Sequence, residues 1–156
     1  MDTLNICTLA STSILDELMR FPWGRMLLIG FSLYLILCFY GWIFADRILF
    51  PAPKQPAYQL DNTVFFLESA KGAKIACKHL TAEQPKGLTI LYSHGNAEDL
   101  GRIEEFLQPW VADGWSVLAY DYPGYGHSSG KPSEEGCYNA IDTVYQHLTK
   151  ILGIPP

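Results

Sequence analysis

The chain has 156 residues and a net charge of −5, and hydrophobic residues make up 49% of it. This length accommodates one small folded domain with a leader segment, but not two hydrophobic cores. The negative charge, with Lys and Arg scattered rather than clustered, excludes a nucleic-acid-binding surface. The four cysteines form no C-x-x-C pair, which argues against a zinc site or a disulfide framework. Small buried hydrophobic positions are favoured for Cys38, Cys77 and Cys137.

An N-terminal tail of mixed character covers residues 1–25. Apolar residues recur at helical spacing between Ile14 and Met19, and Ser13 precedes them as an N-cap candidate. This pattern is compatible with a short interfacial helix and with a disordered tail, and the sequence does not separate the two.

The run from Met26 to Ala45 contains no charged side chain. At about 1.5 Å rise per residue, its length in helical form matches the roughly 30 Å hydrocarbon core of a bilayer. Trp23 and Trp42 lie near its ends, as is typical of membrane interfaces. The run is longer than the core of a signal peptide, and no small-residue cleavage site follows it. We therefore predict an uncleaved transmembrane helix that contacts the lipid bilayer, in an orientation that the flanking arginines do not determine.

A proline-rich linker is predicted at residues 46–56, because three prolines remove backbone donors and favour extended chain. The folded domain is predicted at residues 57–156. It begins with two strand-like runs, 63–68 and 73–80, joined by a Lys71-Gly72 turn. Alternation in the second run predicts one solvated and one buried face, with His79 in the buried phase as a packed histidine rather than a catalytic base.

Apolar runs at 88–92 and 115–120 predict buried parallel strands, joined by a helix that ends at Asp113-Gly114. A last helix begins after Ser133, which is predicted to cap it. The sequence thus predicts an α/β fold: an antiparallel hairpin followed by parallel strands with helices.

Two motifs follow the two buried strands. Tyr92-Ser93-His94-Gly95-Asn96-Ala97-Glu98-Asp99 follows the first, and Tyr120-Asp121-Tyr122-Pro123-Gly124-Tyr125-Gly126-His127-Ser128 the second. With this spacing, the chain resembles the α/β-hydrolase family, and within it the serine-hydrolase branch that carries an N-terminal membrane anchor. The resemblance covers the N-terminal half of the family's fold, and it favours a domain on the non-cytoplasmic side.

The resemblance implies a role for the His94-Gly95-Asn96-Ala97 turn. It implies that the main-chain N–H of Asn96, with Ala97 beside it, is one donor of an oxyanion hole. The alternative is that the turn only ends a strand and caps a helix. Tyr122 and Tyr125 either line an acyl pocket or pack their loop.

Residues 126–130 spell G-x-S-x-G, yet a nucleophile elbow needs a strand directly before it and a helix directly after. Pro123 and Gly124 separate Ser128 from the preceding strand, and Pro132 delays the next helix. We therefore predict that Ser128 is not a nucleophile and that Asp121 ties the loop by local hydrogen bonds.

The predicted function is the truncated or N-terminal portion of a membrane-anchored serine hydrolase that cleaves an ester, thioester or amide. By resemblance it uses no cofactor or metal and takes an acyl-type small molecule or lipid as substrate. Because the nucleophile, acid and histidine are absent, we predict no activity for this polypeptide alone. One alternative is a membrane-tethered interaction module that uses the exposed edge of its sheet. Another is a single-pass membrane protein with no sheet.

Overall fold

The computed structural model describes residues 22–156, so most of the N-terminal tail lies outside the described residues. The chain divides into two compact units, Met1–Ala45 and Asp46–Pro156, and each is described by itself. The described part of the first unit is helical, since helix α2 begins at Pro22, and this helix continues past the end of the unit to Leu49.

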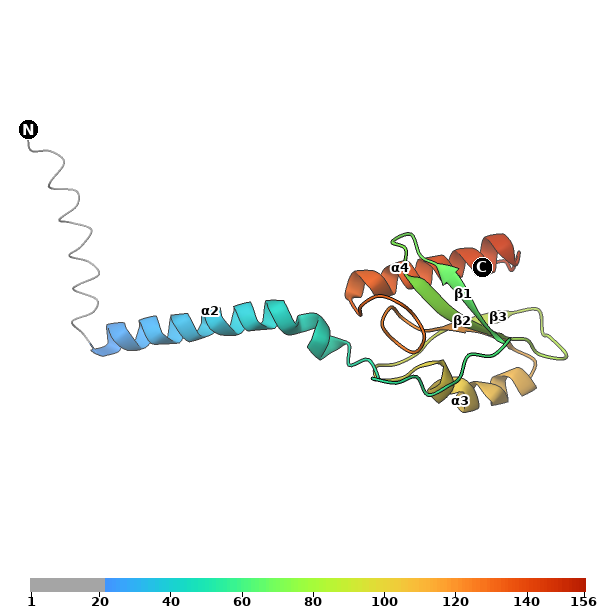
Figure 1. The fold of residues 1–156 in the computed structure, drawn as a ribbon, viewed down its shortest axis with the longest axis horizontal. Coiled ribbons are helices and arrows are strands. Elements are labelled where there is room, and N and C mark those ends of the chain that lie inside the picture. The colour runs from blue at the N-terminus through green and yellow to red at the C-terminus, as the bar shows by residue number, and fades with distance from the viewer. Residues whose placement is uncertain (1–21) are drawn as a thin grey trace, which may run out of the picture. The chain divides into compact units, whose positions relative to one another are not determined.

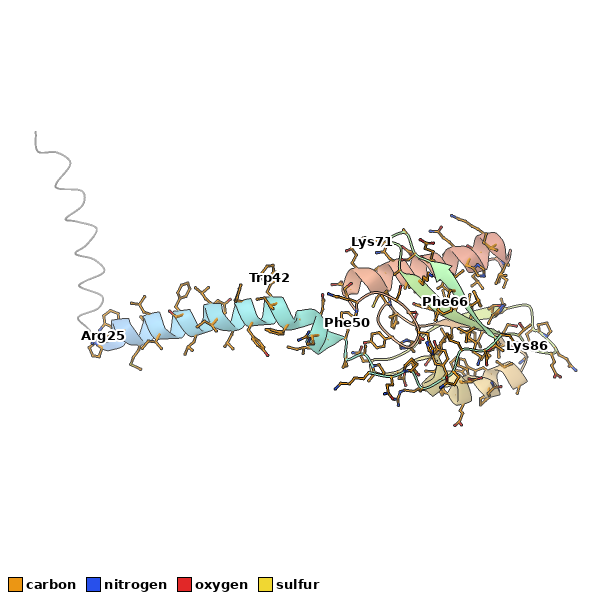
Figure 2. All side chains as sticks on the ribbon, in the orientation of Figure 1. Arg25, Trp42, Phe50, Phe66, Lys71 and Lys86 are labelled. Carbon is orange, nitrogen blue, oxygen red and sulfur yellow. The ribbon has the colours of Figure 1, made fainter. Side chains whose placement is uncertain are left out.

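Helix α2 is longer than the apolar run from which it was predicted. Its 28 residues extend four positions beyond Met26–Ala45 at each end, so the first residues of the predicted linker are helical. The helix ends at Leu49, because Pro51 lacks a main-chain N–H and cannot continue it. Trp42 projects from the helix and is 79% exposed (Figure 2). Within residues 22–156, α2 is the one helix long and apolar enough to cross a membrane.

The second unit is built on a four-stranded sheet with the strand order β1-β2-β4-β3. The strands are β1 (Val64–Glu68), β2 (Lys74–Leu80), β3 (Thr89–Ser93) and β4 (Ser116–Tyr120). β1 and β2 form the predicted antiparallel hairpin, β2 and β4 are antiparallel, and β3 and β4 are parallel. At the hairpin turn, Gly72 has a φ of +78° and donates its N–H to the carbonyl of Ser69, a conformation that favours glycine.

Two helices cover opposite faces of the sheet (Figure 1). Helix α3 (Leu100–Ala112) connects β3 to β4, and helix α4 (Glu134–Gln146) is followed by a π-helical turn, His147–Ile151. Ser133 caps α4 as predicted, accepting the N–H of Gly136. At the predicted end of α3, Gly114 has a φ of +95°, which is typical of a glycine that ends a helix.

Each face of the sheet carries its own hydrophobic cluster. On the α4 side lie Ile75, Cys77, Leu118, Tyr120, Ala140, Val144 and Leu148. On the α3 side lie Ala76, Leu100, Ile103, Leu107, Val117 and Ala119.

The prediction of a solvated face on β2 was therefore wrong. Ala76 is fully buried, and Lys78 reaches through the α3 side to an ion pair with Glu104 at 2.8 Å. Alternation of Lys and Ala in one strand does not show that a helix from elsewhere in the chain covers the same face.

Candidate functional site

The His94–Ala97 turn connects the end of β3 to the N-cap of α3. Gly95, Asn96 and Ala97 are exposed, and Ala97 has a φ of +61°. The Gly95 N–H donates to the Glu98 carboxylate at 2.7 Å. In the described part of the chain, the main-chain N–H groups of Asn96 and Ala97 have no hydrogen-bond acceptor. The turn therefore has two exposed main-chain amides without an acceptor, at the carboxyl edge of two parallel strands.

His94 lies beneath this turn rather than in solvent. Its side chain is fully buried, and its Nδ1 donates to the carbonyl of Gly95 at 2.8 Å. Its ring packs against Tyr122 and Tyr125, with centroids 4.6 and 5.4 Å away. Nε2 lies 3.5 Å from an oxygen of the buried Asp121. His94 therefore supports the turn from within the fold.

Two fully buried carboxylates, Asp99 and Asp121, lie at the N-terminus of α3. Asp99 is the N-cap and accepts the N–H of Arg102 at 3.1 Å and that of Ala57 at 2.7 Å. Asp121 accepts the N–H of Leu100 at 2.8 Å and the hydroxyl of Tyr58.

The prediction that Asp121 ties its loop by local hydrogen bonds is confirmed for its main-chain carbonyl, which accepts the Ser128 hydroxyl at 2.8 Å, but not for its side chain. Its side-chain partners Leu100 and Tyr58 lie 21 and 63 positions away in the sequence. Burial raises the pKa of Asp121, and the hydrogen bonds from Tyr58 and Leu100 oppose that rise. Burial and the Asp121 hydrogen bond raise the pKa of Tyr58, so its hydroxyl keeps its proton and remains a donor.

Sequence reasoning missed Asp99 and Tyr58. Asp99 carried a usable signal, because an Asp directly before an apolar helical run is a typical N-cap. Tyr58 carried none, since it lies in irregular chain more than 40 residues before the helix that it contacts.

Ser128 uses its hydrogen-bonding capacity inside the loop. Its hydroxyl donates to the carbonyl of Asp121 at 2.8 Å and accepts the N–H of Ala76 at 2.9 Å. It is 8% exposed, and neither a strand directly precedes it nor a helix directly follows it. This environment is that of a structural serine, which agrees with the interpretation that Ser128 is not a nucleophile.

The two tyrosines of this loop differ. Tyr125 is 1% exposed and lies at 3.4 Å from the side-chain oxygen of Asn96, so it packs the loop. Tyr122 is half-buried and packs against His94 and Tyr120, and it remains the candidate for contact with a substrate.

Burial raises the pKa of the Cys77 thiol to about 12, so it remains protonated and unreactive. Across residues 22–156, no three His, Cys, Asp or Glu side chains lie close enough together to hold a metal ion.

Comparison with known proteins finds similar sequences and folds. The model of the family described as "Serine aminopeptidase, S33" matches residues 83–153, which include β3, α3, β4 and α4. Alpha/beta hydrolase domain-containing protein 17C from Mus musculus is 38% identical over 97 residues. Over its folded domain the chain is similar to α/β-hydrolases. The matched segment is 60% of this chain and 29% of that α/β-hydrolase.

Further proteins show the same similarity. Protein 17B from Xenopus tropicalis is 38% identical over 59% of this chain and 32% of its own length. An α/β-hydrolase from Vibrio vulnificus superposes with a TM-score of 0.51 and 25% identity, over 60% of this chain and 32% of that one. A probable hydrolytic enzyme from Pseudomonas aeruginosa has the same fold, with a TM-score of 0.51 and 22% identity, over 65% and 35% of the two chains. The chain thus spans about a third of the length of the α/β-hydrolases that it matches.

Proposed function

We propose that this chain provides the oxyanion-binding part of a serine hydrolase that cleaves an ester, thioester or amide bond. The observation that carries the proposal is the exposed turn with two amides, Asn96 N–H and Ala97 N–H, that have no acceptor within the described residues. Because the turn is exposed, both donors are accessible to a ligand that enters from solvent.

The chemistry follows from where negative charge develops. Attack on an acyl carbonyl transfers the electron pair of the C=O bond to the oxygen, and fixed N–H donors stabilise that charge. Asn96 N–H supplies one donor, with Ala97 N–H beside it, while the other donor follows the nucleophile in chain order. Loss of one such donor reduces the rate about 100-fold or more. The substrate class is an acyl-type small molecule or a lipid, and no cofactor takes part.

Hydrolysis also needs a nucleophile, a histidine and an acid in one constellation. In the described residues 22–156, no serine lies on a strand-to-helix elbow, and Ser128 is fully engaged by Asp121 and Ala76. We infer that the 156-residue polypeptide alone has no hydrolase activity.

A fluorophosphonate probe tests this inference on the purified chain. We expect no covalent adduct on Ser128, and the exposed Ser129 of the same loop gives the background level of labelling. A stoichiometric adduct on Ser128, above the level of Ser129, would contradict the inference.

A graft tests the hydrolase assignment itself. The 97 residues of the mouse protein 17C that match this chain are replaced by the matched segment of this chain. We expect the graft to hydrolyse short p-nitrophenyl esters and to react with fluorophosphonate at a serine of the mouse part. A folded graft with neither reaction, while the unmodified mouse protein shows both, would contradict the assignment.

We further propose that α2 anchors the chain in a membrane with the folded domain on the non-cytoplasmic side. The helix length of 28 residues and its apolar composition support anchoring. The test is retention of the chain in membranes after carbonate extraction, followed by protease protection in sealed vesicles. Arginines at Leu35 and Leu37 form the control, since each costs about 3 kcal/mol at mid-membrane and should release the chain. In sealed vesicles whose cytoplasmic face is inward, protection of the domain from added protease would place it on the cytoplasmic side and reverse the proposed sidedness.

A second candidate function is supported by the outer edge of β3. Among the described strands, β3 pairs with β4 alone, so the hydrogen-bonding groups on its other side are open to another strand. An interaction module would bind a partner by strand addition. Hydrogen exchange separates the candidates, because a strand-adding partner slows exchange in Thr89–Ser93 without affecting the His94–Ala97 turn.

A further inference from the structure

Residues 57–58, here called the strap, lie directly against the first turn of α3. A Cβ atom at Gly101 would be 2.8 Å from the carbonyl carbon of Ala57 and 2.9 Å from the Tyr58 Cβ. Such distances are below any ordinary contact, so position 101 has room only for glycine. The fold therefore brings a segment from before the sheet into close packing with the helix that follows the oxyanion turn.

The strap donates to both of the buried carboxylates at this helix end. Ala57 N–H donates to Asp99, whose other oxygen accepts the N–H of Arg102. Tyr58 OH donates to Asp121, whose other oxygen accepts the N–H of Leu100. Each carboxylate thus has one oxygen on the strap and the other on the first turn of α3.

Tyr58 is itself held in place by the loop that follows β4. Its carbonyl lies 3.2 Å from His127 Nε2, and its ring packs edge-on against the His127 ring with centroids 4.9 Å apart. The main-chain N–H of His127 donates to the Tyr58 hydroxyl at 3.4 Å. These contacts fix both the backbone and the side chain of the strap.

We propose that Tyr58 is a positioning residue for the oxyanion turn, acting through Asp121. This rests on the proposed function of the turn. Asp121 accepts the N–H of Leu100, where α3 begins. An oxygen of Asp121 also lies 3.5 Å from Nε2 of the buried His94, and Nδ1 of the same ring donates to the Gly95 carbonyl. The His94–Ala97 turn is therefore held at both of its ends by groups that contact Asp121.

The segment before the strap contacts the turn directly as well. The Asn96 side chain donates to the carbonyl of Leu49 at 2.9 Å. Catalytic amides have to be held within about 0.5 Å of their productive positions, which requires supporting groups that are themselves fixed. Without the Tyr58 hydroxyl, a buried carboxylate oxygen loses its donor, and Asp121 is free to turn away from Leu100 and His94.

The test uses the full 156-residue chain in detergent micelles with Tyr58→Phe, which removes the hydroxyl alone. Tyr138→Phe is the matched control, because it removes the hydroxyl of an exposed tyrosine that bonds Glu134. We expect at least a 10-fold faster exchange of the Leu100 amide in Tyr58→Phe. We also expect NMR shifts of the Asn96 and Ala97 amides and of the His94 ring nitrogens, with the exchange of Leu118 in β4 unchanged.

Gly101→Ala provides a second variant that displaces the strap from outside and leaves the Tyr58 hydroxyl intact. We expect the same amides to respond, with Arg102 added because Asp99 also loses Ala57. The proposal is overturned if neither variant changes Asn96, Ala97 and His94 more than Tyr138→Phe does. It is equally overturned if Leu118 exchange accelerates by the same factor as Leu100, which would show a general loss of stability.

These readouts require no catalytic activity, so they are independent of the proposed function. An inactive graft would refute the hydrolase assignment and leave the strap measurement intact. Conversely, an active graft combined with unchanged spectra in Tyr58→Phe would refute the strap alone.

Discussion

Two glycine-containing loops lie at the carboxyl edge of the sheet, residues 94–97 and 126–130. They differ in whether their polar groups have hydrogen-bond partners within the fold. In the loop at 126–130 the Ser128 hydroxyl and amide are bonded within the fold, to Ala76, Asp121 and Tyr125. In the turn at 94–97 the amides of Asn96 and Ala97 are left open to solvent. The loop that spells a catalytic motif is structural, and the turn without a nucleophile has the free donors.

The difference arises from what each loop lies against. The loop at 126–130 folds back beside the start of β2, where the Ser129 N–H donates to the Lys74 carbonyl and the Ser129 hydroxyl accepts the Lys74 N–H. The turn at 94–97 extends beyond β3, and Glu98 of the same connection satisfies the amide of Gly95. The donors of Ser128 and Ser129 are therefore bonded within the fold, whereas the amides of Asn96 and Ala97 have no acceptor among the described residues.

The substitution with the largest expected effect on the contrast between the two loops is Gly126→Ala. A Cβ there would lie 1.8 Å from an oxygen of Asp121, so the carboxylate has to leave Tyr58 and Leu100. We expect a loss of about 3–5 kcal/mol in the free energy of unfolding, the range of severe core mutations. Denaturant unfolding in mild detergent measures it.

Gly72→Ala is the control for this change. It has a similar positive φ of +78° but nothing within 4 Å of the added Cβ. We expect about 1 kcal/mol from backbone strain alone. Equal losses for the two glycines would show that the contact with Asp121 carries no weight.

Ser128→Ala separates a structural serine from a catalytic one. The substitution leaves the fully buried Ala76 N–H without an acceptor, which costs about 1–3 kcal/mol. Ser129→Ala removes a bond to Lys74 at an exposed position, where water replaces it, and should cost less. Thermal unfolding of both variants measures the difference, and a stability for Ser128→Ala equal to that of the unmodified chain would contradict the structural role.

A further prediction concerns the pH dependence of folding stability, to which His79 contributes. Burial and the nearby His147 lower the pKa of His79 in the folded chain. The unfolded chain takes up this proton below about pH 6.5, so the stability contributed by neutral His79 is present above that pH and falls on acidification. We expect the unfolding midpoint to decrease between pH 7 and pH 5.5, and His79→Leu to reduce that decrease. An identical pH dependence in the variant would assign the effect to other groups.

The smallest expected effect concerns the backbone of the turn. Ala97 has a φ of +61°, so Ala97→Gly relieves left-handed strain of about 1–2 kcal/mol but adds roughly 0.5–1 kcal/mol of unfolded-state entropy. We expect a net gain of about 0–1.5 kcal/mol, measured by the denaturation midpoint. A clear loss of stability would mean that the Ala97 methyl group makes contacts that stabilise the turn.

The sequence was sufficient where local chemistry decides the structure. The strands, the Ser133 cap and the Gly114 stop follow from apolar runs and from residues with specific backbone preferences. It failed where distant segments meet. The burial of Ala76 depends on α3, and the partners of Asp121 lie up to 63 positions away. No periodicity within a window of ten or twenty residues encodes such contacts.

The most direct test of the oxyanion assignment compares two substitutions at Asn96 in the graft with the mouse protein. Asn96→Ala and Asn96→Pro both remove the amide side chain, but the proline alone removes the main-chain N–H. We predict that kcat for ester hydrolysis falls about 100-fold or more in Asn96→Pro relative to Asn96→Ala, with little change in KM. Equal values of kcat for the two folded variants would contradict the account.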